Sequence, residues 1–152
     1  MRDSINNLGF RVAIAPGTLV AFTAAPMDPQ QFPTPIINGT WIDRRGFDSL
    51  TFCFAVTGMG LSTGDPTKAG FLNFVLHDAI SPDYSDAALV AETDQIVSGW
   101  VNADGNLAAK VGYLGDKKFV RLSLVPSTVQ GATKSSVAVI ATLGNATALP
   151  VL

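Results

Sequence analysis

The sequence predicts an all-β fold, an antiparallel β-sandwich of about eight strands, and three observations lead to this prediction. Residues that favour helices are scarce, because Glu92 is the only glutamate and charged residues make up 14% of the chain. Fourteen glycines and nine prolines interrupt the sequence at short intervals. Between these breakers apolar side chains recur at every second position, which is the period of a strand with one buried face. The 152 residues suffice for one compact domain with a core.

The N-terminal region differs from the rest, and we predict an extended arm over residues 1–35 followed by a β-sandwich domain over residues 36–152. Prolines punctuate the arm at Pro16, Pro26, Pro29, Pro33 and Pro35. Each proline lacks a backbone N–H, and the spacing forbids a regular helix. The strand-like segments 10–15 and 18–22 are candidates to add to a sheet edge. Because an apolar extended arm is unfavourable in water, we expect it to lie on its own domain or on a neighbour.

Six alternating segments follow the arm, and each predicts a strand. They cover residues 47–56, 70–78, 95–103, 107–113, 119–125 and 135–144. In the first of them, the alternate residues from Leu50 to Val56 are apolar and share one face. Asp104–Gly105 separates the third segment from the fourth, and it is the strongest hairpin signal in the chain. Short strands with turns between them predict two packed sheets in a sandwich with a jelly-roll-like order.

Residues 85–93, SDAALVAET, are the one candidate for a helix. Ser85 is a plausible N-cap for this helix. The segment is short, however, and it is equally compatible with another strand.

Few residues offer catalytic or metal-binding chemistry. His77 is the only histidine, so a Ser/His/Asp triad or a histidine metal site would depend on it; hydrogen bonding at a strand end is the favoured role. Asn102, Asp104 and Asn106 resemble the start of a calcium loop, but Tyr113 occupies the twelfth position, where such a loop needs an acid. A tight hairpin explains these residues more simply. We therefore predict that the protein is not an enzyme and has no metal and no cofactor.

The single cysteine and the two tryptophans have structural interpretations. Cys53 is alone, which excludes an internal disulfide, and we expect a buried structural thiol within its strand. Trp41 and Trp100 could form a sugar-stacking platform, as in a carbohydrate-binding module. One core tryptophan and one interface tryptophan are the favoured interpretation.

The charge and hydropathy of the chain limit its partners. A net charge of −2 argues against a general nucleic-acid binder, which would present a basic face. No uninterrupted apolar run reaches the ~20 residues that a membrane span requires. The low charge, against about 25% in typical domains, suits a surface that partners partly cover.

The most charge-dense segment is GYLGDKKFVRLSLV, residues 112–125. A phosphate-binding loop would require G-x-x-x-x-G-K-[ST] followed by a helix, but Gly112 and Gly115 are too close together and a strand follows. We therefore expect Gly115–Asp116 to form a turn and Gly112 to allow a close approach of the chain. We expect Lys117, Lys118 and Arg121 at the rim or outer face, where aspartates of this domain or of a partner can pair with them.

Within this region, VGYLGDKKFVRL (residues 111–122) resembles the V-G-Y-I-G-x-K-R-Y-V-R-V signature of a family of small tailed-bacteriophage head proteins. RGFDSLTF (residues 45–52) and VAVIATLGNATALPV (residues 137–151) also agree with that family. Lys118 stands where arginine is commoner, Phe119 replaces tyrosine, and the usual basic residue is missing after the Leu-Gly turn.

The resemblance implies a viral structural protein with a jelly-roll-like fold, which binds the bacteriophage head shell and stabilises it as a capsid cement or decoration protein. The expected partners are the major capsid protein and neighbouring copies of the chain, as a dimer or trimer, with no nucleic acid and no membrane. The expected location is the outer surface of the capsid in the virion, after synthesis in the cytoplasm of the host bacterium. The candidate contact residues are Phe32, Pro33, Pro35, Ile36, Trp41, Lys117, Lys118 and Arg121. A head–tail connector or tail component and, in a different class, a carbohydrate-binding module are the alternative hypotheses.

Overall fold

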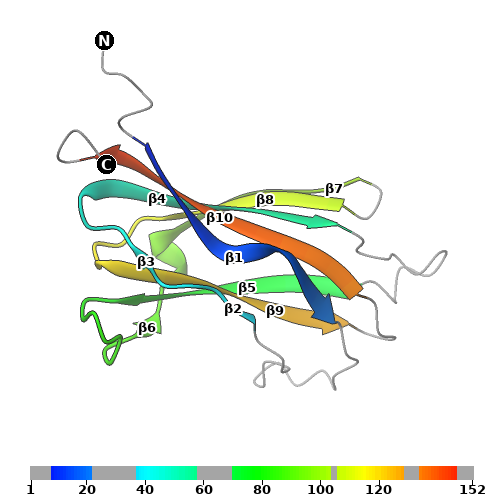
Figure 1. Cartoon of the computed structure of the whole chain (residues 1–152), viewed down its shortest axis with the longest axis horizontal. Coiled ribbons are helices and arrows are strands. Elements are labelled where there is room, and N and C mark those ends of the chain that lie inside the picture. The colour runs from blue at the N-terminus through cyan, green and yellow to red at the C-terminus, as the bar shows by residue number, and fades with distance from the viewer. Residues whose placement is uncertain (1–7, 22–36, 58–69, 104–105, 129–133, 147–152) are drawn as a thin grey trace, which may run out of the picture.

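The computed structural model describes residues 8–21, 37–57, 70–103, 106–128 and 134–146, and these residues form two layers of antiparallel β-sheet (Figure 1). The strands within these ranges are β1 (Leu8–Ala21), β2 (Ile37–Asn38), β3 (Ile42–Asp43), β4 (Phe47–Thr57), β5 (Gly70–Ala79), β6 (Ala88–Leu89), β7 (Gln95–Ala103), β8 (Asn106–Tyr113), β9 (Phe119–Thr128) and β10 (Lys134–Ala146). A single 3-10 turn, η3 (Glu92–Asp94), precedes β7.

The strands pair in a nested manner. β1 pairs with β10, β2 and β3 pair with β9, β4 pairs with β8, and β5 pairs with β6. Sheet A has the order β1-β10-β4-β8-β7, and sheet B has the order β2-β9-β5-β6, with β3 also on β9. This nesting is the strand order of a jelly roll, to which β7 is added at one edge. The predicted β-sandwich is confirmed, and the short strands β2, β3 and β6 raise the number of strands above the expected eight.

The core lies between the sheets and is built from the predicted alternating positions. Side chains exposed by 3% or less include Leu50, Phe52, Phe54 and Val56 on β4, Val120, Leu122 and Leu124 on β9, and Val137, Val139 and Ala141 on β10. Phe54 of sheet A meets Phe74 of sheet B, with ring centroids 6.0 Å apart. β4 therefore uses one face for the core and leaves the other face outward, whereas in β9 Ser123 and Val125, at positions that alternate with the core residues, are buried as well.

The first part of the predicted arm is an edge strand of sheet A. β1 pairs with β10, as expected for the strand-like segments, and its register shifts on both sides of Ile14. Gly17 has a φ of +82°, a conformation that glycine adopts without steric strain. A shifted register and a proline make an edge less suited to pairing with a further strand. The rest of the arm, with Phe32, Pro33, Pro35 and Ile36, lies outside the described residues.

The predicted hairpin between β7 and β8 is present. Ala103 lies opposite Asn106, so two residues connect the strands, and these two, 104–105, lie outside the described residues. This pairing agrees with the hairpin interpretation of Asn102 and Asn106.

Of the two interpretations left open for residues 85–93, the α-helix does not form; these residues form turns, the two-residue strand β6 and the start of η3. One expectation is wrong, because Cys53 is exposed rather than buried. The physical reason is the alternation of β4, which gives the inward positions to Phe52 and Phe54 and turns the intervening thiol outward.

The two faces of β4 predict opposite effects of neighbouring substitutions. Phe52→Ala should lower the free energy of unfolding by about 3–5 kcal/mol, because it removes a fully buried ring and leaves a cavity. Cys53→Ala, one residue away on the exposed face, should change it by less than about 0.5 kcal/mol. Urea denaturation of the two variants checks this, and equal effects would contradict the assignment of the faces.

Candidate functional site

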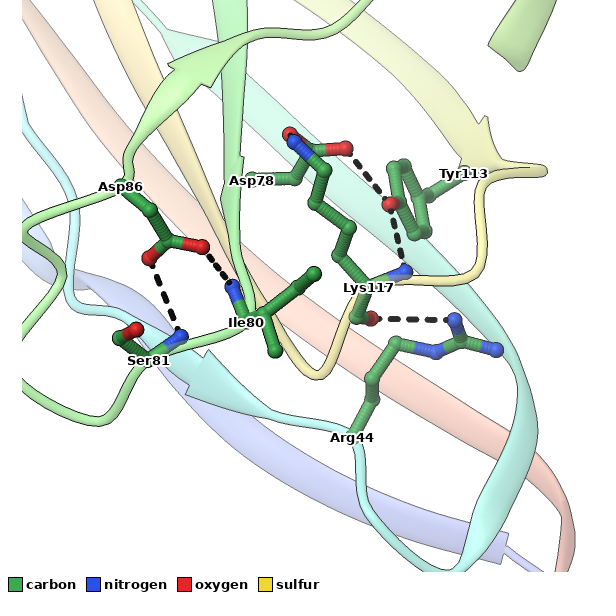
Figure 2. A network of polar contacts seen from close by, with 7 residues as sticks. All are labelled: Arg44, Asp78, Ile80, Ser81, Asp86, Tyr113 and Lys117. Carbon is green, nitrogen blue, oxygen red and sulfur yellow. Dashed lines mark hydrogen bonds and ion pairs between the residues drawn. The ribbon is translucent and has the colours of Figure 1, made fainter.

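The signature segment forms the end of β8, a loop and the start of β9, and a buried carboxylate organises it (Figure 2). Asp78 of β5 is only 6% exposed. The Tyr113 hydroxyl donates to its Oδ2 at 2.7 Å, and Lys117 Nζ lies 2.8 Å from its Oδ1. The Lys117 backbone N–H in turn donates to the Tyr113 hydroxyl at 3.2 Å. Asp78 belongs to sheet B and Tyr113 to sheet A, so this network joins the two layers.

Arg44, which follows β3, completes the network from the other side. Its Nη1 donates to the carbonyl oxygens of Gly115 at 2.8 Å and Lys117 at 3.2 Å, and its Nη2 donates to the carbonyl of Asp48 at 2.9 Å. The guanidinium carbon lies 5.4 Å from the centre of the Tyr113 ring. The loop between β8 and β9 is thus held by hydrogen bonds from Arg44 to its main-chain carbonyl groups, as well as by the ion pair between Lys117 and Asp78.

The network raises the pKa values of Tyr113 and Lys117. Burial, followed by the hydrogen bond to Asp78, raises the pKa of Tyr113. The hydrogen bond with Asp78 also raises the pKa of Lys117. Tyrosine therefore stays a neutral donor and lysine stays charged at neutral pH, which suits a structural clamp.

Gly115 is required by this arrangement, whereas Gly112 is not. A Cβ on Gly115 would overlap the Tyr113 hydroxyl and ring. A Cβ on Gly112 would find its nearest neighbour, Ile96 Cβ, at an ordinary 3.7 Å. The close approach that the sequence suggested for Gly112 therefore occurs at Gly115.

A second group of side chains lies on the outer side of sheet B, and we call it the aromatic cluster: Trp41, Tyr84, Phe119, Arg45 and Arg121. The Trp41 and Tyr84 rings stack with centroids 4.5 Å apart and planes 11° apart. Tyr84 meets Phe119 edge to face at 5.5 Å. The Arg121 guanidinium lies 4.8 Å from the centre of Trp41, and that of Arg45 lies 5.2 Å from the centre of Phe119.

Tyr84 is held in the cluster by the loop that follows β5. Its φ of +59° is unusual for a residue with a side chain and costs about 1–2 kcal/mol. The Asp86 carboxylate accepts the backbone N–H groups of Ile80 at 2.9 Å and Ser81 at 3.0 Å (Figure 2), and these bonds lower the pKa of Asp86. Asp83 accepts the hydroxyl of Ser85 at 2.9 Å. The loop is therefore fixed by its own carboxylates.

His77 and Arg121 are direct neighbours across β5 and β9. Burial, and then the positive charge of Arg121, lower the pKa of His77, and Asp78 opposes this with a smaller effect. His77 is therefore neutral at pH 7. Its Nδ1 and the Nε of Arg121 are both buried and have no hydrogen-bond partner.

The outer face of sheet A, which we call the sheet A face, is broad and nearly uncharged. Its described side chains include Phe10 and Val12 on β1, Ser136, Ala138, Ile140 and Thr142 on β10, Ser49, Thr51, Cys53, Ala55 and Thr57 on β4, Ala108 and Lys110 on β8, and Ile96 on β7. Phe10 is 60% exposed, Val12 and Ile96 are 55% exposed, and Ile140 is 43% exposed. Between Ala55, Ala108 and Ala138 lies a shallow hollow of about 460 Å³. Lys110 is the one charged side chain in this set.

The predicted contact residues fall into separate places. Trp41 and Arg121 come together in the aromatic cluster, whereas Lys117 pairs within the chain with Asp78. Lys118 is exposed, and its carbonyl accepts the backbone N–H of Arg44 at 3.0 Å. Tyr84 was missed because no sequence period indicates which turn residue stacks on a distant tryptophan.

The two tryptophans lie on different sheets. Trp41 lies between β2 and β3 beside β9 in sheet B, and Trp100 belongs to β7 at the far edge of sheet A. The Trp41 ring is already in contact with Tyr84 and Arg121.

Groups of three or more His, Cys, Asp or Glu residues that could hold a metal ion do not occur among the described residues. Within the same residues, no helix is long and apolar enough to cross a membrane. Comparisons of the chain with protein-family models, with curated proteins and with solved structures gave no match.

Different outcomes are expected for alanine at the two glycines of the signature. Gly115→Ala should lower the free energy of unfolding by about 1–3 kcal/mol, because the new methyl group meets the fixed Tyr113 ring. Gly112→Ala should leave stability unchanged or raise it slightly. Thermal or urea unfolding measures both, and a harmless Gly115→Ala would show that the Tyr113 clamp is not rigid.

Proposed function

We propose that the protein is a structural, non-enzymatic component of tailed-bacteriophage heads, which binds the outside of the assembled shell and stabilises it. The resemblance of residues 111–122 to the head-protein signature supports the family. The jelly-roll strand order agrees with the fold that the resemblance implies. The observation that carries the proposal is the sheet A face, because the largest exposed apolar patch of a domain is often a site of protein interaction.

The dimensions of the sheet A face bear on how it binds. Five strands about 4.8 Å apart, with about six residues of each, cover roughly 400 Å². A specific interface buries about 800 Å² on each partner. The sheet A face therefore supplies about half of a normal contact, and neighbouring loops or the arm supply the rest.

Lys110 indicates which kind of partner fits the sheet A face. The face offers no carboxylate among its described side chains, so two copies packed through it would bury two unpaired ammonium groups. A shell protein with a flat apolar surface and one carboxylate opposite Lys110 avoids this cost. The major capsid protein is therefore the proposed occupant, and contacts between copies would use other surfaces.

A charged residue at the centre of the sheet A face tests the contact directly. Ile140→Asp should weaken binding to purified heads by about tenfold or more, since the new carboxylate is buried in an apolar interface. The matched control is Leu114→Asp, because Leu114 is also exposed, by 57%, but lies in the loop after β8. Cosedimentation with heads that lack the protein measures both variants. Wild-type binding by Ile140→Asp would contradict the sheet A face as the contact.

Removal of the protein tests the function itself. Heads assembled without it should lose DNA at a lower temperature than complete heads, and adding the purified protein should restore the wild-type value. Quantitative mass spectrometry of virions separates this role from that of a head–tail connector or tail component, because a decoration protein is present in proportion to the shell protein. Unchanged heat resistance together with its absence from virions would contradict the proposal.

A further inference from the structure

Arg121 has no ion-pair partner among the residues that the structure describes. Among the described residues, ion pairs join Arg45 with Asp43 and Lys117 with Asp78, and neither includes Arg121. Its contact is with the ring of Trp41, at 4.8 Å. A guanidinium presents a planar set of donors, and stacking on an aromatic ring leaves the edges of that plane available. Arg121 is therefore positioned to bind an acceptor from outside.

The surroundings of Arg121 are short of acceptors. Its Nε is buried without a partner, and so is Nδ1 of His77, which lies directly opposite on β5. Side chains directly opposite on paired strands have Cβ atoms about 4.5–5.5 Å apart, so these two nitrogen atoms belong to neighbouring side chains. Buried polar atoms without partners are uncommon in folded proteins and require an explanation. A hydrogen-bond acceptor bound beside β5 and β9 would explain these two atoms.

The site is ordered before any ligand arrives. Trp41 is fixed by the stacked Tyr84, and Tyr84 is fixed by the loop that Asp83 and Asp86 hold. Holding Tyr84 at a positive φ is unfavourable, and such local strain concentrates at functional sites. A guanidinium on this fixed surface loses little entropy on binding.

The charge balance selects the ligand. Arg121 contributes one positive charge, His77 is neutral at pH 7, and Arg45 and Asp43 neutralise each other. Asp83 and Asp86 in the adjoining loop are negative, and hydrogen bonds lower the pKa of both. A dianionic phosphate or a nucleic-acid backbone would need more positive charge than this. A carboxylate carries a single charge, so Asp83 and Asp86 repel it less than they repel a dianion, and its two oxygens match the two-pronged geometry of the guanidinium.

We propose that Arg121, with His77 beside it and Trp41 behind it, forms a binding site for a carboxylate group, supplied by an Asp, Glu or C-terminal carboxylate of a partner protein. The site lies on sheet B, on the opposite side of the sandwich from the sheet A face, so it does not depend on the proposed contact with the shell. In a particle it would face away from the shell and receive an acidic residue of another protein.

NMR of the full-length protein tests the site, with sodium acetate as the probe and sodium chloride and inorganic phosphate at equal ionic strength as comparisons. Acetate should give saturable shifts of the His77 ring and the Arg121 Nε–H signals. It should also raise the pKa of His77, because an anion offsets the charge of Arg121 and favours the imidazolium ion. Chloride should give no saturable shift, and phosphate should bind more weakly than acetate.

Two variants and one control connect the response to Arg121. Arg121→Gln should abolish the saturable shifts that acetate causes. Arg121→Lys keeps the positive charge but loses the paired N–H donors of the guanidinium, so it should weaken acetate binding about tenfold. Lys110→Gln is the control, because it removes one positive charge from the sheet A face on the opposite side of the sandwich, and it should bind acetate as the wild type does. The proposal is overturned if acetate gives no saturable shift, if Arg121→Lys binds as well as wild type, or if phosphate binds more tightly than acetate.

Discussion

The buried carboxylate of Asp78 is the constraint on which one end of the sandwich depends. A charge that is 6% exposed is tolerated only with full pairing, and Tyr113 and Lys117 provide it from the other sheet and from the following loop. To bring Lys117 there, the loop must turn tightly over Tyr113, which requires Gly115 and the carbonyl contacts of Arg44. The most charge-dense segment of the sequence is therefore first of all a joint between sheets.

The jelly-roll nesting leaves two outward faces of different chemistry. Sheet A has alanines, threonines and isolated larger apolar side chains around one lysine, and sheet B has stacked aromatic rings and arginines. Aromatic residues and arginine dominate the strongest positions of protein interfaces, whereas a broad apolar face provides area. The two faces are thus suited to two partners, with the shell proposed on sheet A and a carboxylate on sheet B.

Much of the fold could be predicted because it rests on local alternation. Period-two segments located the long strands and their inward residues, and Asp104–Gly105 located the hairpin. The short strands and the stack of Tyr84 on Trp41 could not be predicted, because they depend on one positive φ and on a loop closed by Asp86. The alternation of β4 also places Cys53 on the outward face, but the apolar residues on both sides of Cys53 in the sequence suggested that it is buried. Charges near one another in sequence, such as Lys117 and Arg121, end in different environments because tertiary partners decide their roles.

A cryo-EM map of the phage head would show directly whether the sheet A face lies against the shell. We expect density for the sandwich on the outer surface of the shell, with β4, β8 and β10 toward the capsid protein and Trp41 and Arg121 away from it. A head without this density, or a sandwich bound to the shell through sheet B, would contradict this expectation.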